Sequence, residues 1–340
     1  MAINRVVRIA GVMIASAAIV IGCGTAATPA PTAAPTAAAT AAVTAAPTAA
    51  PTAAAAIKIG VAFPNSDTFL SRVQDGMKAE ATAKGVEITI TDAKDDTAAQ
   101  LTQVENFISQ KVSAIIVVPV DTSAAQPMAD AAKAAGIPLV FVNRNPSIKG
   151  FPYVGSDSLF AGQVEMEQLA KLAGNKGDVV ILEGQVSNEA AVLRTQGCNE
   201  KATAAGMKVV DTLSGEWDRA KAQTITENWL QSGKLKAGMV VCANNDEMAL
   251  GAINALKAAK IALTAGTGVI VGGVDATSEA LAAMQAGDLA TTVFQDAKGQ
   301  GKGGVDAAID LIGGKTVPDY VDIPYVLVTK DNLSQFLGAN

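Results

Sequence analysis

The feature that most constrains this chain is a regular alternation of short aliphatic runs with longer stretches of helical spacing, which starts at Ile57. Aliphatic strands that are each followed by a helix are typical of parallel sheets covered on both faces. Two sets of such units predict an α/β fold with two doubly wound parallel-sheet lobes. The expected strands are 57–63, 86–91, 114–118, 138–142, 179–182, 208–213, 239–242, 269–274 and 290–294.

The first 56 residues lack this alternation. Two arginines precede an apolar run from Ile9 to Ile21, which predicts a secretory signal peptide over residues 1–22. The ending Val-Ile-Gly-Cys resembles a bacterial lipobox, which implies cleavage before Cys23 and a lipid on its thiol. An ordinary signal peptide with an incidental cysteine is the alternative. Residues 23–56 are almost wholly Ala, Thr and Pro, a composition that predicts an extended tether.

The composition excludes several classes of function. The chain has 26 Lys and Arg against 32 Asp and Glu, with no basic stripe, so nucleic acid is not an expected partner. It has no His, which excludes Ser-His-Asp and Cys-His nucleophiles and His-ligated zinc. The segment from Gly299 to Gly304 matches G-x-G-x-x-G, but the acidic residue that should close the next strand is missing. We therefore expect close helix packing there.

Three further residues carry expectations about the core. Cys198 falls in a helix-like stretch and Cys242 in an apolar strand. A secreted location permits a disulfide, but we expect two buried free thiols and keep the disulfide as the alternative. Trp229 lies at helical spacing from Ile225 and is expected in the core.

Polar side chains follow many of the expected strands. In open α/β sheets, ligands bind outside the carboxyl ends of the strands, so such side chains gather where a ligand would lie. Asp92, Asp121 and Asp246 are expected instead to cap the helices that follow them. Arg144, which follows Asn143, is a poor cap and carries a planar fork of five donors, which favours a binding role.

Several segments resemble the type I periplasmic sugar-binding proteins of the ribose and galactose class, more closely the galactose, glucose and inositol binders. They are 141–146, 153–157, 243–252, 272–276 and 323–333. The resemblance covers nearly all of residues 57–340. It implies a first lobe of 57–156 plus 296–325 and a second lobe of 157–295 plus 326–340. The chain would cross between them near Ser156-Asp157, Gln295-Asp296 and Tyr325-Val326.

The resemblance also implies a ligand held between the lobes. The residues carried over are Asp67, Phe69, Asn143, Arg144, Arg194, Trp217, Asn245, Asp275 and Gln295. Sugar hydroxyls both donate and accept hydrogen bonds, and aromatic rings stack on the apolar face of a sugar or cyclitol ring. Glucose and galactose binders carry an acidic residue where Ala190 stands, which leaves inositol or a pentose open beside a hexose. The segment 172–178 is too short and too poor in carboxylates for their calcium loop.

The implied function is the substrate-binding lipoprotein of an ABC sugar importer. It would trap a monosaccharide or cyclitol by hinge closure and present the closed form to the permease and ATPase subunits. We expect a monomer, anchored outside the cytoplasm by its lipid, with no cofactor, no metal and no enzymatic activity. A sensory binder that presents its ligand to a membrane receptor is the main alternative. An extracytoplasmic enzyme is another, and a regulator of the lactose-repressor type would need a DNA-binding domain where the secretion signal stands.

Overall fold

The structure, a computed structural model, describes residues 56–338. The predicted signal peptide, the lipidation site Cys23 and the tether up to residue 55 lie outside the described residues. Within residues 56–338, no helix combines the length and apolar character needed to cross a bilayer.

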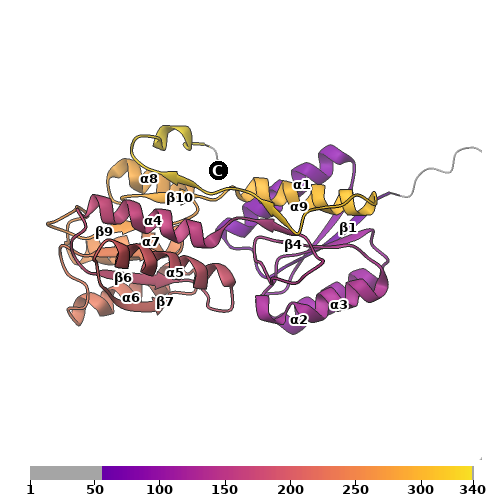
Figure 1. Ribbon diagram of the computed structural model, residues 1–340, viewed down its shortest axis with the longest axis horizontal. Helices are drawn as coiled ribbons and strands as arrows, with labels where there is room; N and C mark the ends of the chain where they lie inside the picture. Colours follow the sequence, from indigo (N-terminus) through magenta and orange to yellow (C-terminus); the bar gives the residue numbers. More distant parts are fainter. Residues whose placement is uncertain (1–55, 339–340) are drawn as a thin grey trace, which may run out of the picture. The chain divides into compact units, whose positions relative to one another are not determined.

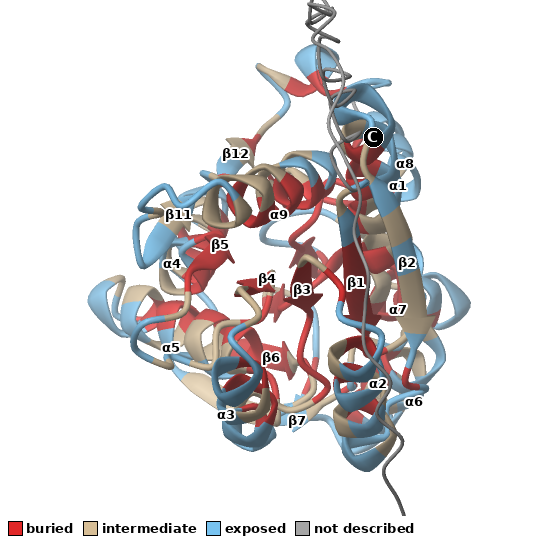
Figure 2. Ribbon diagram, turned by 90° about the vertical axis from the view of Figure 1, so that its right-hand side faces the viewer, coloured by how far each residue is buried: buried red, intermediate tan, exposed pale blue. Residues whose placement is uncertain are grey.

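The first lobe is built on a six-stranded parallel sheet with the order β11-β5-β4-β3-β1-β2. Helices α1 and α9 cover one face of this sheet, and α2 and α3 cover the other. The central strands are fully buried (Figure 2). The strands are β1 (Lys58–Phe63), β2 (Glu87–Asp92), β3 (Ala114–Val117), β4 (Leu139–Val142), β5 (Tyr153–Gly155) and β11 (Tyr320–Asp322). The helices are α1 (Thr68–Lys84), α2 (Thr97–Ser109), α3 (Gln126–Ala135) and α9 (Ala297–Ile312), with a 3₁₀ turn at Thr122–Ala124.

The second lobe contains a four-stranded parallel sheet with the order β7-β6-β8-β9. An antiparallel pair, β10 with β12, lies beside β9 through an isolated bridge from Gly272 to Thr291. Helices α4 and α5 pack on one face, and α6, α7 and α8 on the other. The strands are β6 (Val179–Glu183), β7 (Val209–Ser214), β8 (Val240–Ala243), β9 (Ile270–Gly272), β10 (Thr292–Phe294) and β12 (Val326–Val328). The helices are α4 (Ser158–Leu172), α5 (Glu189–Ala204), α6 (Arg219–Gln231), α7 (Asp246–Ala258) and α8 (Ser278–Ala286), with a 3₁₀ turn at Leu333–Gln335.

The chain passes between the two lobes three times (Figure 1). It leaves the first sheet after β5 and returns between β10 and α9, which packs against α1 and the first sheet. It leaves again between β11 and β12. The predicted class, two doubly wound parallel lobes with three crossings, is therefore confirmed. Three short strands that the sequence pattern did not predict, β5, β11 and β12, lie next to these crossings.

The cysteine prediction is half wrong. Cys198 of α5 and Cys242 of β8 are both fully buried, as expected, but they form a disulfide and are not free thiols. Both side chains belong to the apolar layer between the second sheet and helices α4 and α5, which brings them together although 44 positions separate them. Trp229 is 1% exposed in the core on the other face, as predicted.

The expected helix caps are confirmed at one position of three. Asp121 accepts a hydrogen bond from the backbone N–H of Ser123 and caps the 3₁₀ turn. Asp92 accepts from Lys94 in a turn before α2, so it is not a helix cap. Asp246 lies in the first turn of α7, which Asn245 caps, and its buried carboxylate instead accepts from Thr277 and Thr292.

The glycine-rich segment lies inside α9, as the helix-packing interpretation expected. A Cβ on Gly301 would approach the backbone oxygen of Val73 in α1 to 2.1 Å. Glycine therefore allows α1 and α9 to pack with their backbones almost in contact.

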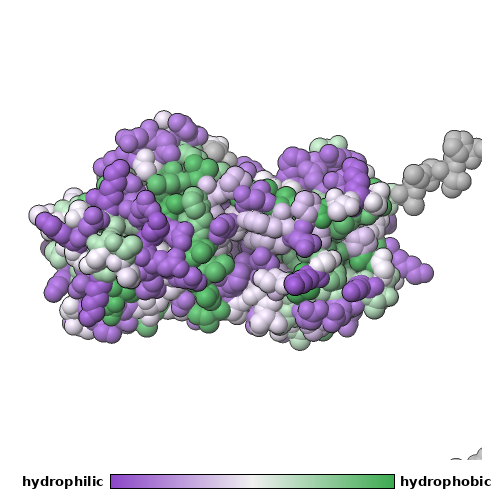
Figure 3. All heavy atoms as spheres, in the orientation of Figure 1, coloured by the Kyte–Doolittle hydropathy of each residue, from purple (hydrophilic) through white to green (hydrophobic). Residues whose placement is uncertain are grey.

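The visible surface is mostly hydrophilic, with a band of hydrophobic side chains over α4 and α5 (Figure 3). Phe160 of α4 and Val192 of α5 are among the exposed large apolar residues of these helices.

Candidate functional site

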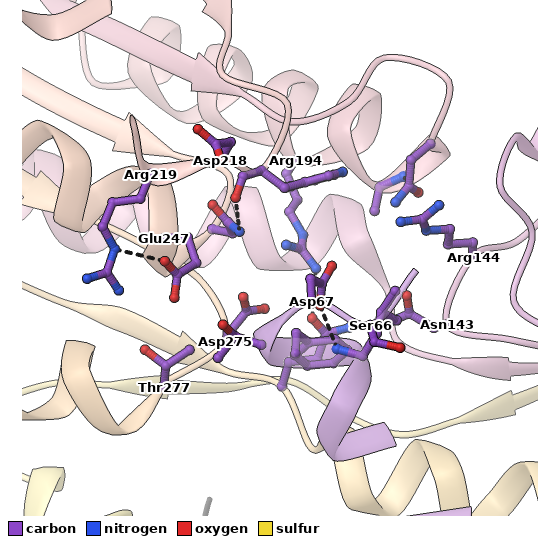
Figure 4. Close-up of a pocket in the computed structure, with 18 residues that line it drawn as sticks. Ser66, Asp67, Asn143, Arg144, Arg194, Asp218, Arg219, Glu247, Asp275 and Thr277 are labelled. Atoms are coloured by element: carbon purple, nitrogen blue, oxygen red, sulfur yellow. Dashed lines mark hydrogen bonds and ion pairs between the residues drawn. The ribbon is translucent and has the colours of Figure 1, made fainter. Parts of the chain in front are cut away.

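All nine residues carried over from the resemblance line one cavity of about 360 Å³. They come from loops that follow strands in both lobes, from the first turn of α1 and, for Arg194, from the second turn of α5. Figure 4 shows the side chains of Asp67, Asn143 and Arg144 from the first lobe facing those of Arg194 and Asp275 from the second. Their contact with a ligand stays a prediction.

Asp67 and Phe69 reach the cavity because the chain turns sharply from β1 into α1. Asp67 is the N-cap of α1, and its Oδ1 accepts a hydrogen bond from the backbone N–H of Leu70 at 2.7 Å. This bond fixes one carboxylate oxygen and leaves Oδ2 to face the cavity. Phe69, which follows in the first turn, is half-buried and packs against the core of the first lobe.

Asn143 and Arg144 follow β4. Asn143 has a φ of 65°, and its Nδ2 donates to Oε1 of Gln300 at 2.9 Å. Arg144 is buried, and its Nη1 donates to the carbonyl oxygens of Pro119 at 2.9 Å and Val120 at 3.1 Å. Two of the five N–H groups of the guanidinium are thereby used, and they hold the fork in one orientation.

Arg194, in α5, is the most constrained side chain of the cavity. Its Nη1 donates to the carbonyl oxygen of Asn244 at 2.6 Å, and its Nη2 donates to Oε1 of Gln295 at 2.9 Å. The guanidinium carbon also lies 5.6 Å from the ring centroid of Trp217, within the range of a cation–π contact. These hydrogen bonds and the cation–π contact therefore hold the guanidinium of Arg194 at the cavity wall.

The loops of the second lobe supply the remaining predicted residues. Asn245 caps α7 by accepting from the backbone N–H of Met248 at 3.0 Å. Trp217 and Asp275 both have positive φ values, of 66° and 122°, which side chains other than glycine rarely adopt. Such backbone conformations cost free energy and persist where the surrounding structure over-determines them, often at binding sites.

The carboxylates of the cavity are held in an environment that disfavours their charge. Burial raises the pKa of Asp275 well above its ordinary value, and the positive charge of Arg194 only partly opposes this. Desolvation likewise raises the pKa of Asp67, although its side chain still reaches the cavity, and the backbone bond from Leu70 and the charge of Arg144 oppose the rise. A ligand that donates hydrogen bonds to these oxygens would stabilise their ionised forms.

Several buried donors lack a partner among the described residues. Three belong to residues that line the cavity, namely Nε of Arg144, Nε of Arg194 and Nε1 of Trp217, and the fourth is Nδ2 of Asn244, outside the lining. A buried donor without a partner costs about 1–3 kcal/mol. These three groups therefore favour a ligand rich in hydrogen-bond acceptors at this cavity.

The cavity has further lining residues that the sequence did not single out. Arg219 donates from Nε to Glu247 at 2.8 Å and pairs through Nη2 with Glu279 at 2.6 Å, so its charge is neutralised locally. Asn188, the N-cap of α5, could have been suspected from its place before that helix. The others are Ser66, Thr68, Leu70, Asp218 and Thr277.

One group of metal-type donors occurs within the described residues, away from the cavity lining. Glu165, Cys198 and Cys242 lie within 4.8 Å of one another and are buried. The disulfide uses both sulfur atoms, so these residues do not offer thiolate ligands in this structure.

Comparison with known proteins agrees with this architecture. A profile of the periplasmic binding protein domain matches residues 59–316. A Rhizobium meliloti protein assigned to rhizopine binding is 43% identical over 283 residues, which are 81% of this chain and 90% of that protein. A xylitol-binding protein of Mycolicibacterium smegmatis is 34% identical over 282 residues, 81% of this chain and 78% of its own.

Solved structures are also similar to this chain in fold and sequence. An ABC transporter solute-binding protein from Bacillus halodurans, with bound myo-inositol, is 41% identical with a TM-score of 0.79. The match covers 85% of this chain and 100% of that one. Fold and sequence agree with the predicted resemblance, and the chain belongs to the periplasmic binding protein family.

Proposed function

We propose that this protein is the extracytoplasmic binding component of an ABC importer for a monosaccharide or cyclitol. The observation that carries the proposal is the cavity between the two lobes, where the buried carboxylate of Asp275 and the exposed carboxylate of Asp67 face two oriented guanidinium groups. The names of the relatives support it, since they describe binding of rhizopine, xylitol and myo-inositol.

The chemistry of the cavity suits a neutral polyol. Asp67 and Asp275 offer acceptors, and the free Nε–H groups of Arg144 and Arg194 offer charge-assisted donors. Opposite charges nearly balance in the cavity lining, which has four acidic side chains (Asp67, Asp218, Glu247 and Asp275) and three guanidinium groups (Arg144, Arg194 and Arg219). Trp217 adds an aromatic surface for the apolar face of a ring.

The proposed mechanism is closure of the two lobes on the ligand. In this proposal one lobe is 57–156 plus 296–325, the other is 157–295 plus 326–340, and the three crossings would form the hinge. Two contacts between the lobes support this mechanism: Nη2 of Arg72 approaches Oγ of Ser278 at 3.4 Å, and Thr122 donates to the carbonyl oxygen of Ser187 at 3.2 Å. The closed form would dock on the permease and ATPase subunits.

We also propose that the protein is anchored outside the cytoplasm and that it does not catalyse a reaction. A signal peptide over residues 1–22, a lipid on Cys23 and a tether to residue 56 would hold the monomeric protein at the outer face of the cytoplasmic membrane or in the periplasm. With no histidine in the chain, the cavity offers binding groups in place of an activated nucleophile. Its role is to capture and deliver a ligand, not to transform it.

Thermal unfolding of the purified protein tests the ligand class. Galactose, glucose, xylose, ribose and myo-inositol are each added at increasing concentration. A ligand at about 100 times its dissociation constant adds about 2.7 kcal/mol to the free energy of unfolding, a shift of several degrees. A shift with one or more of them is the expected result, and no shift with any would overturn the proposed class.

Uptake measurements test the transport role. Cells that lack this chain should lose high-affinity uptake of the compound that stabilises it, and the wild-type gene should restore the uptake. Undiminished uptake, combined with a lost behavioural or transcriptional response to the compound, would favour the sensory alternative.

A further inference from the structure

Tyr325 joins the cavity to a crossing between the lobes. It lies between β11 of the first sheet and β12 of the second lobe, and it is 6% exposed. Its hydroxyl accepts a hydrogen bond from Nη2 of Arg194 at 2.6 Å, although 131 positions separate the two residues. Its ring centroid is also 5.6 Å from the guanidinium carbon of Arg194.

The same nitrogen of Arg194 contacts a second crossing. Nη2 donates to Oε1 of Gln295, which lies between β10 and α9, where the chain returns to the first lobe. Both N–H groups of Nη2 are therefore directed at crossing segments, and one of Nη1 is directed at Asn244. Nε of Arg194 is buried and has no hydrogen-bond partner among the described residues.

The tyrosine hydroxyl is suited to hold a guanidinium in place. Burial raises the pKa of Tyr325, and the charge of Arg194 opposes that rise. A neutral buried hydroxyl accepts a short, charge-assisted hydrogen bond from the arginine. The aromatic ring, whose centroid is 5.6 Å from the guanidinium carbon, adds a cation–π contact.

We propose that Tyr325 is a positioning residue, whose hydroxyl fixes the guanidinium of Arg194 and ties it to the crossing between β11 and β12. This inference rests on the proposed function, because the position of Arg194 matters for binding only if Arg194 contacts the ligand. Loss of the hydroxyl frees the guanidinium to turn and lowers affinity without removing any residue that lines the cavity.

The first test needs no ligand and uses Tyr325→Phe, which keeps the ring and removes only the hydroxyl. Tyr320→Phe is the matched control, since its exposed hydroxyl donates to Asp322 and does not contact Arg194. In ¹⁵N-labelled protein, hindered rotation of a fixed guanidinium gives separate Nη–H signals, assigned to Arg194 by their loss in Arg194→Lys. We expect these signals to merge or broaden in Tyr325→Phe and to remain in Tyr320→Phe. Unchanged Arg194 signals in Tyr325→Phe would overturn the positioning role.

The second test measures affinity for myo-inositol by calorimetry. Tyr325→Phe is expected to bind about tenfold more weakly than wild type, as for loss of a hydrogen bond to a charged group. Tyr320→Phe is expected to match wild type. Equal affinity of Tyr325→Phe and wild type would overturn the role in binding. If the wild-type protein itself binds neither myo-inositol nor any monosaccharide, the proposed ligand class fails, and the NMR comparison still decides whether Tyr325 holds Arg194.

Discussion

Asn143 donates from its Nδ2 to Oε1 of Gln300 at 2.9 Å, and the two residues are 157 positions apart in the sequence. Gln300 is fully buried in α9, and its Nε2 donates onward to Oγ of Ser156 at 2.8 Å. Ser156 lies at the first crossing, between β5 and α4. Asn143, which lines the cavity in the first lobe, is thus linked through the side-chain amide of Gln300 to the first crossing. In the second lobe, Arg194 is bonded directly to Gln295 and Tyr325, which lie at the other two crossings.

Replacing Gln300 with Leu tests this link. The change keeps the size of the side chain but leaves the half-buried side chain of Asn143 and the buried side chain of Ser156 without their partner. We expect the free energy of unfolding to fall by about 2 kcal/mol, and ligand affinity to fall as well. Chemical denaturation and calorimetry measure the two effects. Gln196→Leu is the control, because Gln196 is exposed on α5 and bonds only to Glu200 there. Equal effects of the two variants would contradict the link.

Replacing Gly184 with Ala should displace Trp217 from the cavity wall. A Cβ on Gly184 would lie 2.1 Å from the indole ring, closer than real contacts allow, so the ring must move. We expect weaker binding and a change in Trp217 fluorescence, while Trp229 stays in the core. Gly313→Ala is the matched control, since its Cβ would meet nothing nearer than 3.4 Å. Wild-type affinity in Gly184→Ala would show that Trp217 does not contribute to binding.

The raised pKa of Glu189 predicts that the free energy of unfolding depends on pH. Burial raises its pKa from 4.5 to about 7, against the opposing effects of the Asn145 backbone and the charges of Arg144 and Arg194. Its Oε2 is buried and has no partner among the described residues. Because the folded state keeps a proton that the unfolded state loses, this group lowers stability as pH rises from about 4.5 to 7, and the penalty is complete above that range.

Glu189→Gln removes that penalty. We expect the variant to unfold at the same temperature as wild type near pH 4 and several degrees higher at pH 8, with at most about 3 kcal/mol gained. Glu105→Gln, at an exposed position of α2, controls for the change in net charge. Parallel curves of unfolding temperature against pH for wild type and Glu189→Gln would contradict the assignment.

The disulfide between Cys198 and Cys242 should stabilise the second lobe. It closes a loop of 44 positions, for which loop-closure entropy gives about 2–4 kcal/mol. Peptide mapping without reduction should recover one linked fragment that contains both cysteines. Cys198→Ala with Cys242→Ala should lower the unfolding temperature to that of the reduced wild type. Recovery of two separate, free-thiol peptides from freshly secreted protein would contradict the disulfide.

The sequence predicted the architecture and the lining of the cavity for different reasons. Strand and helix periodicity defines the layers, and the motifs around Asn143 and Asp275 defined the site through the resemblance. The roles of Gln300 and Tyr325 were missed because each acts through another residue far along the chain. The disulfide was missed because pairing depends on tertiary distance, which local pattern does not encode.

The sequence pattern also did not identify the correct helix cap where several polar residues are adjacent. In the run Asn244-Asn245-Asp246 all three are candidates for a cap, and only the backbone conformation decides among them. Asn245 caps α7, while Asp246 turns inward to Thr277 and Thr292.

Calorimetric titration tests whether the cavity binds a monosaccharide or cyclitol. The wild-type protein and Asp275→Asn are each titrated with the compound that most raises the unfolding temperature. Asp275 is 4% exposed, lines the cavity and carries no part of the hydrophobic core. We expect one-to-one binding by the wild type and a loss of affinity of at least about tenfold in Asp275→Asn, because the change would remove the carboxylate proposed to accept hydrogen bonds from ligand hydroxyls. Equal affinity in the two proteins, or no binding of any monosaccharide or cyclitol, would contradict this expectation.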